Sequence, residues 1–418
     1  MTINESWEIL FDRHRITEQV AHYGSFRISA QQINTVREAR LMAKFDVKQS
    51  LPAIFRTHQL SILPISRGEY VIGPFETHHA LSYDVYPHPH PLHIPALDTL
   101  DGMDIHSEAE ALRVLQLSGA LQDMFASTAV FPTLQGRRGS GKFAFHIACG
   151  RHASQMIAVD NAQIEIDAAF ETESHVFICE SKNSLVHDLL IRQLYYPYRF
   201  VTQKTMKHVV PVSIIYNNYT YYVTQYQFTD IYNYNSLVAT HHYAYTLDTQ
   251  LFRMVDVLAI WQQSKPRSIT GIPFPQADDM RIIINIMQII DQQQHTKAHI
   301  TTHLGYDKRQ TDYYVNAARW LGFIDAHLQL SAMGQLVVNA PPHRQKGLIV
   351  QAMFRTPLFY EMGHILVTQH RIPERSEIVE AMTVHPELRH QLSGDTRIRR
   401  AQTVQAWLRW IMHAVSTR

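Results

Sequence analysis

The sequence predicts an α/β protein, with a strand-rich α/β core in the middle of the chain and a mainly helical part after it. Two observations support this prediction. From Lys142, apolar and polar residues alternate through KFAFHIAC, QIEIDAAFE and SHVFICESK, which is typical of β-strands joined by short polar connections. From Met280, apolar residues recur every three or four positions, which is typical of helices. A chain of 418 residues also exceeds the comfortable size of one hydrophobic core, so we expect two or three domains.

The N-terminal part combines helical and strand patterns. Residues 1 to about 45 look helical, residues 61–75 alternate like strands, and residues 86–95 form a proline-broken loop. Residues 107–125 then predict an amphipathic helix, with Ser107 as N-cap and Glu110 at the capping-box position. The expected domains are an N-terminal helical and β domain at 1–105, a core at 106–262, a linker at 263–279, a helix-turn-helix domain at 280–342 and a helical module at 343–418.

Further elements of the core follow the three strands. Residues 188–204 resemble a helix with Pro197 near its end, and residues 209–217 and 220–228 predict two strands across an Asn217-Asn218 turn. Residues 263–279 collect Pro, Gly, Ser and charge without periodicity, as a linker does.

Composition indicates a folded, soluble protein, because 45% of the residues are hydrophobic and 18% are charged. The first twenty residues carry charges throughout and lack the apolar run of a signal peptide, and no eighteen consecutive residues are apolar, so we expect a cytoplasmic protein without a membrane partner. Cys149 and Cys179 lie in apolar segments and in no CxxC pair, which favours buried free thiols over a disulfide or a zinc site.

The charge is distributed unevenly along the chain. The whole sequence has a formal charge of only +1, but residues 281–418 hold 16 Lys and Arg against 10 Asp and Glu, which leaves the first 280 residues acidic. A basic C-terminal part beside an acidic remainder suits a DNA-reading module joined to a metal-binding one. The alternative is that the uneven charge distribution reflects chance composition of the protein surface.

The strongest chemical signal is Asp167, at the end of the apolar stretch that contains Glu165, followed by Glu180-Ser181-Lys182 at the end of the next one. Alternate side chains of a strand share a face, so Glu180 and Lys182 point the same way. If the two strands pair as a hairpin, the carboxylates of Asp167 and Glu180 can converge on one cation with the Lys182 ammonium nearby.

Such a group suits phosphodiester hydrolysis. Mg²⁺ prefers hard oxygen ligands and keeps several waters, so two carboxylates and a phosphate oxygen suffice to hold it. The metal polarises the phosphate and lowers the pKa of a bound water. Lys182 would orient or help to deprotonate that water, or stabilise the transition-state charge. The ordinary structural alternative is a solvated Glu–Lys pair at the edge of a sheet.

At these residues the sequence resembles the PD-(D/E)xK nuclease superfamily over about residues 140–230. The resemblance implies a mixed sheet flanked by helices, Mg²⁺ as cofactor, Asp167 and Glu180 as metal ligands, and Asp167, Glu180 and Lys182 as the catalytic residues. It also suggests accessory roles for Glu165 and for Gln193, which lies on the helix after the Glu-x-Lys motif. The chain departs from related nucleases in having Pro197 where a Tyr often follows the Gln, and in lacking a proline before Asp167.

Three other patterns have competing interpretations. Residues 136–143 fit G-x-x-x-x-G-K but end in Phe143, and a strand pattern follows where a nucleotide-binding loop needs a helix, so a basic Gly-rich loop is favoured. His88, His90 and His93 predict a surface loop rather than a metal site. The tyrosine-rich residues 215–235 predict a strand pair rather than a base-stacking platform.

The C-terminal part predicts a winged helix-turn-helix. A helix, a second helix, a turn at Gly305 and a recognition helix at about 310–320 are followed by residues 328–338 as a hairpin-like wing. The alternative is that this domain contacts another protein. A further basic helical segment near the C-terminus includes Arg409. The candidate DNA-binding residues are Arg137, Arg138 and Lys142 in the core, Lys308, Arg309, Gln310, Tyr313, Asn316 and Arg319 around the recognition helix, and Arg397, Arg399 and Arg400 near the C-terminus.

Together these features resemble a type II restriction endonuclease. The resemblance implies sequence-specific, Mg²⁺-dependent cleavage of double-stranded DNA, with bases read by the C-terminal modules and by the N-terminal domain. It also implies a homodimer, because cutting both strands of a symmetric site calls for two active sites, and a partner methyltransferase that protects host DNA. A DNA-repair or mobile-element nuclease without strict specificity, and a non-catalytic winged-helix regulator, are the alternatives.

Overall fold

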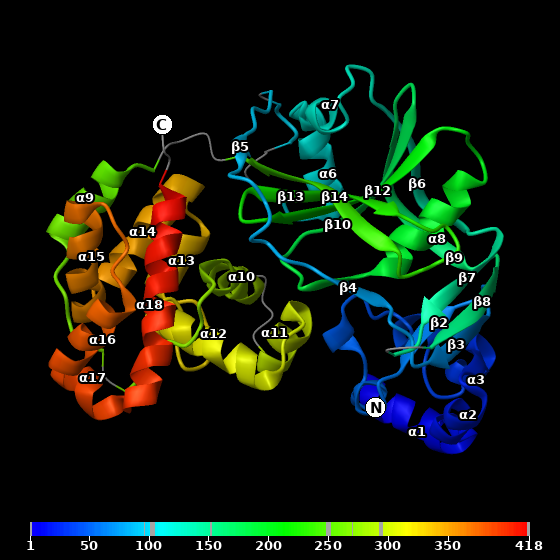
Figure 1. Ribbon diagram of the computed structural model, residues 1–418, viewed down its shortest axis with the longest axis horizontal. Helices are drawn as coiled ribbons and strands as arrows, with labels where there is room; N and C mark the ends of the chain where they lie inside the picture. Colours follow the sequence, from blue (N-terminus) through cyan, green and yellow to red (C-terminus); the bar gives the residue numbers. More distant parts are fainter. Residues whose placement is uncertain are drawn as a thin grey trace. The chain divides into compact units, whose positions relative to one another are not determined.

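The computed structural model describes residues 2–95, 97–100, 105–150, 153–247, 252–269, 271–291 and 296–415. The chain divides into two compact units, one of residues 1–216 and 220–246 and the other of residues 217–219 and 247–418. The first unit is a mixed α/β structure and the second is helical, which confirms the general fold class (Figure 1).

The first unit begins with small helices around a three-stranded antiparallel sheet of order β1-β3-β2. Trp7, Phe11 and Phe55 meet edge to face in its core. The expected helical run through residue 45 is interrupted by β1, because these residues pair with β3. The elements are α1 (Ile3–His14), α2 (Ile16–Tyr23), β1 (Phe26–Ser29), α3 (Ala30–Asn34), α4 (Ala39–Met42), η1 (Lys48–Ser50), α5 (Ala53–Thr57), β2 (Ser61–Pro64) and β3 (Glu69–Gly73).

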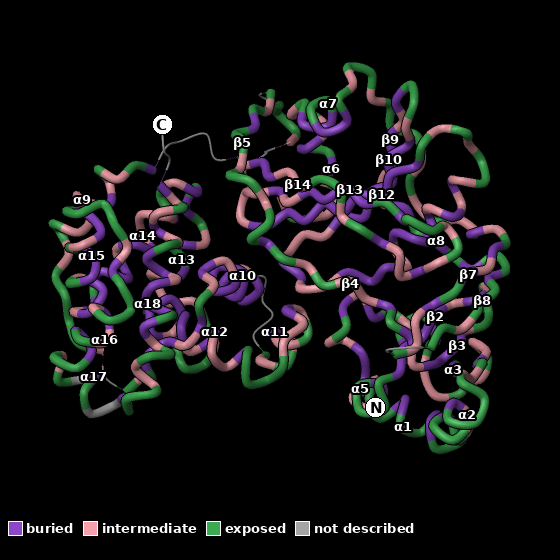
Figure 2. Tube along the Cα trace, viewed as in Figure 1, coloured by how far each residue is buried: buried purple, intermediate pink, exposed green. Residues whose placement is uncertain are grey.

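A seven-stranded mixed sheet of order β5-β14-β13-β12-β10-β9-β6 forms the centre of this unit. Strand β10 pairs antiparallel with β9, as the expected hairpin, and parallel with β12. The central strand β12 is buried at every residue after His208 (Figure 2). The strands are β5 (His90–Pro91), β6 (Phe131–Gly139), β9 (Gln163–Glu171), β10 (His175–Lys182), β12 (His208–Asn217), β13 (Thr220–Phe228) and β14 (Leu237–Thr246).

Helices cover both faces of the sheet. Helix α6 (Glu108–Leu117) and helix α7 (Ala120–Met124) lie on the face of Tyr221, whose hydroxyl donates to the Ala111 carbonyl. Ser107 caps α6 in a capping box with Glu110, as expected. Helix α8 (Ile191–Thr202) lies on the opposite face and contains Pro197 in its interior.

Two two-stranded ladders complete the unit. Strand β7 (Lys142–Ala148) pairs with β8 (Ser154–Asp160) rather than with the central sheet. Strand β4 (His78–Ala80) pairs with β11 (Asp188–Leu190), and β11 leads directly into α8.

The second unit is helical throughout its described elements. Helices α11 and α12 follow α10, with Gly305 in the left-handed region at the turn between α11 and α12. Trp407 of α18 packs against Trp320 of α12, so the two expected C-terminal modules share one core. The helices are α9 (Met254–Gln263), α10 (Met280–Asp291), α11 (Lys297–Leu304), α12 (Lys308–Trp320), α13 (Ala332–Val338), α14 (Pro342–Phe354), α15 (Pro357–Gln369), α16 (Arg375–Val384), α17 (Pro386–Gln391) and α18 (Gly394–Ala414).

The structure differs from the sequence prediction at the wing. Residues 332–338 form helix α13, and the expected hairpin is reduced to one antiparallel bridge between Ile324 and Leu330. The Ser331 hydroxyl accepts a hydrogen bond from the Gly334 amide at 3.0 Å, which caps α13 and favours a helix there.

The boundary between the two units also lies earlier than expected. The expected core extends to residue 262, yet helix α9 packs against α14 and α15 of the second unit. Its Trp261 indole donates to the Tyr360 carbonyl at 2.9 Å and stacks on the Tyr360 ring. Within the described residues, no helix is long and apolar enough to span a membrane.

Candidate active site

The β9–β10 hairpin brings Asp167, Glu180 and Lys182 together. Pairing of Cys179 with Ala168 puts Asp167 and Glu180 in adjacent positions at the end of the paired segment. The Ser181 amide donates a hydrogen bond to Asp167 Oδ2 at 2.8 Å, and Lys182 Nζ donates to Glu180 Oε1 at 2.7 Å. The three predicted catalytic residues are thus linked through the backbone and side chains of one strand end.

Helix α8 adds Gln193 to this group. The Gln193 side-chain amide donates to Glu180 Oε1, the same oxygen that Lys182 contacts. The side chains of Lys182 and Glu180 are only 13% and 7% exposed. This pair is therefore buried, unlike a solvated pair at a sheet edge, and Pro197 one turn later does not prevent Gln193 from reaching it.

Burial and mutual repulsion make the two carboxyl groups poor anions in the absence of a cation. Burial raises the pKa of Glu180 to about 7, with a further increase from Asp167 and an opposing effect of Lys182. Burial also raises the pKa of Asp167, although the Ser181 amide and Lys182 lower it. Burial alone would lower the pKa of Lys182, but Glu180 and other carboxylates raise it, so Lys182 is protonated at neutral pH.

Two acidic residues that the sequence reasoning missed also lie near this group. Glu108 and Asp46 both raise the pKa of Lys182, and Asp46 raises that of Glu180. Burial raises the pKa of Glu108, and Glu180 and Asp46 raise it further. The Ser107 capping signal locates Glu108 on the first turn of α6, but nothing in the local sequence around Asp46 links it to strands more than a hundred residues away.

The donor set fits a Mg²⁺ ion. Asp167 Oδ1 and Glu180 Oε2 accept no hydrogen bond from any residue that the structure describes, and buried Gln193 Oε1 has no partner either. Mg²⁺ needs only one or two protein carboxylates with its remaining ligands from water and substrate, and a cation between them would favour the charged forms that burial disfavours. Among the described residues, no three His, Cys, Asp or Glu side chains are grouped as a metal site.

Glu165 does not join the group. It is paired with Arg137 on β6, 3.3 Å apart, and the side chains of Arg137 and Glu165 are 50% and 59% exposed. Arg138 lies over the Phe200 ring and donates to the Gln135 carbonyl. Both arginines of the Gly-rich segment thus have partners within the protein, so a bound ligand is not needed to explain their positions.

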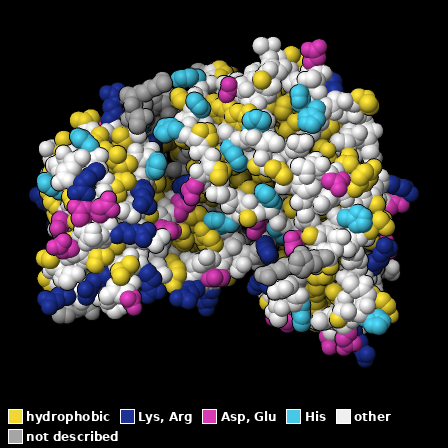
Figure 3. Space-filling view, in the orientation of Figure 1, with side chains coloured by type: hydrophobic (Ala, Val, Ile, Leu, Met, Phe, Trp, Pro, Cys, Tyr) yellow, Lys and Arg dark blue, Asp and Glu magenta, His cyan; other side chains and the backbone are white. Residues whose placement is uncertain are grey.

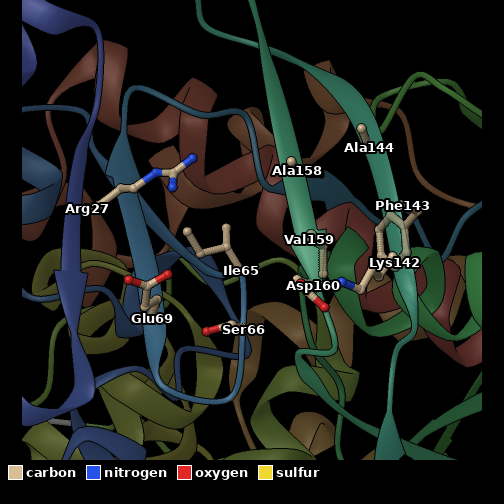
Figure 4. Close-up of a pocket in the computed structure, with 10 residues that line it drawn as sticks. All are labelled: Arg27, Ile65, Ser66, Glu69, Lys142, Phe143, Ala144, Ala158, Val159 and Asp160. Atoms are coloured by element: carbon tan, nitrogen blue, oxygen red, sulfur yellow. Dashed lines mark ion pairs between the residues drawn. The ribbon is translucent and has the colours of Figure 1, made fainter.

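Lys142 lies at an open hollow of about 500 Å³ between the N-terminal sheet and the β7–β8 ladder. Figure 4 shows Lys142 directed toward Asp160 on the neighbouring strand, and the two form an exposed ion pair 2.8 Å long. Lys142 begins strand β7 rather than a helix, as expected for a segment that is not a nucleotide-binding loop. The favoured Gly-rich loop is wrong for residues 136–139, which belong to strand β6. The hollow contains none of the three predicted catalytic residues; Arg27, Ile65, Ser66, Glu69, Phe143, Ala144, Ala158 and Val159 complete its lining.

The candidate DNA-binding residues of the second unit lie on two neighbouring helices. Lys308, Arg309 and Gln310 are exposed at the start of α12, while Tyr313, Asn316 and Arg319 are half-buried. Figure 3 shows Lys and Arg side chains gathered over this unit.

Helix α18 adds three arginines beside α12. Arg399 is exposed, Arg397 donates to the Leu392 carbonyl, and Arg400 lies close enough to Tyr313 for the tyrosine to affect the pKa of Arg400. Burial lowers the pKa of Arg400, and Arg399 lowers it further. Arg409, on the same helix, donates to Gln405.

Other predicted features have ordinary structural roles. His88, His90 and His93 are exposed, as a surface loop requires. In the tyrosine-rich segment, Tyr221, Tyr226 and Tyr234 are buried, which confirms a packed strand pair. The two cysteines are free thiols, Cys179 buried and Cys149 half-buried.

Comparison with known protein families assigns three stretches of the chain. Residues 4–72 match a domain of unknown function (DUF6996), residues 73–246 match a second (DUF6997), and residues 282–416 match a third (DUF7226). No curated protein and no solved structure matches the chain. The second stretch ends where the first compact unit ends, and it contains Asp167, Glu180 and Lys182, whereas Asp46 comes from the first stretch.

Proposed function

We propose that this protein is a Mg²⁺-dependent endonuclease that hydrolyses phosphodiester bonds in double-stranded DNA, with a PD-(D/E)xK-type core. The observation that carries the proposal is the hydrogen-bonded group of Asp167, Glu180, Lys182 and Gln193, with one carboxylate oxygen of each acid left unbonded by described residues. A buried pair of carboxylates with raised pKa values beside a protonated lysine is typical of a functional site rather than a structural one.

Each residue has a distinct role in the proposed reaction. Asp167 and Glu180 would hold Mg²⁺, which when bound polarises the phosphate and lowers the pKa of a water. The Ser181 amide fixes Asp167, and Gln193 fixes Glu180, so both carboxylates stay oriented. Lys182, whose pKa is raised, would donate a hydrogen bond from its ammonium group to a phosphate oxygen and stabilise the developing negative charge instead of accepting a proton.

The proposed role is that of a type II restriction endonuclease that acts in the cytoplasm as a homodimer beside a protective methyltransferase. The helix-turn-helix of α11 and α12 supports base reading, because Lys308, Arg309 and Gln310 are exposed at the start of α12. Arg397, Arg399 and Arg400 add positive charge that would meet DNA phosphates.

Digestion of unmethylated phage DNA tests both parts of the proposal. We expect discrete fragments with Mg²⁺ and none with EDTA. A Mg²⁺-dependent smear would instead indicate a nuclease without strict specificity, and binding without cleavage would indicate a regulator. Asp167→Ala and Lys182→Ala should abolish cleavage and retain DNA binding, while the exposed Glu18→Ala serves as a matched control. Full cleavage by either site variant would refute the assignment.

A further inference from the structure

Residues 44–48 of the N-terminal part form a short segment with alternating burial. Phe45 and Val47 are buried, Lys44 and Lys48 are exposed, and Asp46 is half-buried between them. Phe45 belongs to the hydrophobic core that surrounds Trp7 and packs near Phe55. The apolar side of the segment is thus anchored, which leaves its charged side chains on the other side.

A backbone hydrogen bond fixes this segment to the core that carries the candidate active site. The Lys48 amide donates to Asp188 Oδ1 at 3.0 Å. Asp188 begins β11, and β11 continues into α8, which supplies Gln193 to Glu180. Only five residues of the chain lie between Lys182 and Asp188. The segment is therefore held beside the same strand end and helix start that form the catalytic group.

The charges of the segment act on the site from this position. Asp46 affects the ionisation of Glu180, Lys182 and Glu108, and Lys44 affects that of Glu108. Lys48 affects Asp188. Lys44 therefore lies near Glu108, and Lys48 lies near Asp188, which its own backbone amide also contacts.

An acidic site needs cations to receive a phosphodiester backbone. Asp167, Glu180, Glu108 and Asp46 surround Lys182, and Lys182 is already paired with Glu180. A Mg²⁺ ion would neutralise the scissile phosphate. The neighbouring phosphates of the same strand would still lie beside an excess of carboxylates. Within the described part of the chain, the ammonium groups of Lys44 and Lys48 form no ion pair, so they remain available to an anion from solvent.

We propose that Lys44 and Lys48 bind backbone phosphates of the DNA strand being cut, so that the N-terminal part of the chain contributes to the substrate-binding surface at the active site. This inference rests on the proposed nuclease function. It adds a binding role for the 44–48 segment, which the sequence pattern alone did not reveal.

The test compares the full-length variant Lys44→Ala/Lys48→Ala with the control Arg13→Ala/Arg40→Ala, which removes two exposed cations from the same N-terminal part. Affinity for a 30-base-pair duplex of mixed sequence is measured by fluorescence anisotropy over a salt series, and cleavage of phage DNA with Mg²⁺ is measured in parallel. Loss of two phosphate contacts should reduce the steepness of the plot of the log association constant against the log salt concentration by about 1.8. We also expect kcat/KM to fall about ten-fold or more, and Lys44→Arg/Lys48→Arg to restore most of both.

The outcomes separate this inference from the nuclease proposal. If the wild type cleaves and the lysine variant matches the arginine control in salt slope and rate, the phosphate-binding role is wrong and the nuclease proposal stands. A second outcome is that the wild type does not cleave DNA, but the lysine variant has a smaller salt slope than the wild type and the arginine control. The phosphate-binding role then stands and the nuclease proposal is wrong. If Lys44→Arg/Lys48→Arg does not restore binding, the role of positive charge at these two positions is also contradicted.

Discussion

The protonation of Glu180 should make the stability of the first unit depend on pH. Its pKa rises from 4.5 to about 7 on folding, mainly because the carboxyl is buried. The folded protein therefore holds this proton more tightly than the unfolded chain does, so the free energy of unfolding falls as pH rises from 4.5 to about 7. At about 1.4 kcal/mol for each unit of pKa, the loss across this window is about 3 kcal/mol.

Glu180→Gln isolates this effect because glutamine has nearly the same shape and does not titrate. The variant also removes the carboxylate of Glu180 from beside Lys182, whereas Asp46 and Glu108 continue to favour the charged form of the lysine. From pH 5 to pH 8, the wild type should therefore lose about 3 kcal/mol of unfolding free energy relative to the variant.

Hydrogen exchange of β9 and β10 peptides in a urea series, with EDTA present to remove metal ions, measures this difference for the first unit alone. Glu18→Gln, on an exposed position of α2, should show no such trend. A difference between Glu180→Gln and the wild type that stays constant between pH 5 and pH 8, or that moves in favour of the wild type, would refute the reasoning.

Three further predictions concern the site and the second unit. Gln193→Leu removes a donor to buried Glu180, so single-turnover cleavage should slow about ten-fold, and an unchanged rate would contradict its positioning role. Mg²⁺ should raise the unfolding midpoint of the wild type more than that of Asp167→Asn in a thermal-shift assay; an equal rise would argue against metal binding at Asp167. Gly334→Ala would force Cβ against the Phe323 carbonyl and should cost about 1–3 kcal/mol in denaturant unfolding, whereas Gly394→Ala meets open space and serves as the control.

Local patterns were sufficient where neighbouring residues determine the structure. Alternation of apolar and polar residues predicted strands β9 and β10, because side chains on successive strand positions point to opposite faces, and the structure pairs the two strands antiparallel. Ser107 and Glu110 predicted the start of α6, since a capping box satisfies amides within one turn. Asp167, Glu180 and Lys182 come together as expected, but Asp167 lies in the middle of β9 and not at its end, because β9 continues to Glu171; only Glu180 and Lys182 lie at a strand end.

Local patterns failed where a distant partner decides the outcome. Residues 26–29 form a strand because β3 pairs with them, and helix α9 belongs to the second unit because Trp261 packs on Tyr360. Residues 332–338 could alternate as a wing, but the Ser331 cap and close packing of Gly334 on the Phe323 backbone favour a helix.

The sequence by itself determined the α/β class, the hairpin and its three candidate catalytic residues, because each depends on periodicity or spacing within one short stretch. Only the tertiary structure decided that Glu180 is buried, that Gln193 contacts it, and that Asp46 lies near it. Burial and long-range electrostatics depend on which elements pack together, and no local residue pattern encodes the approach of residues 44–48 to a strand end more than 130 positions later.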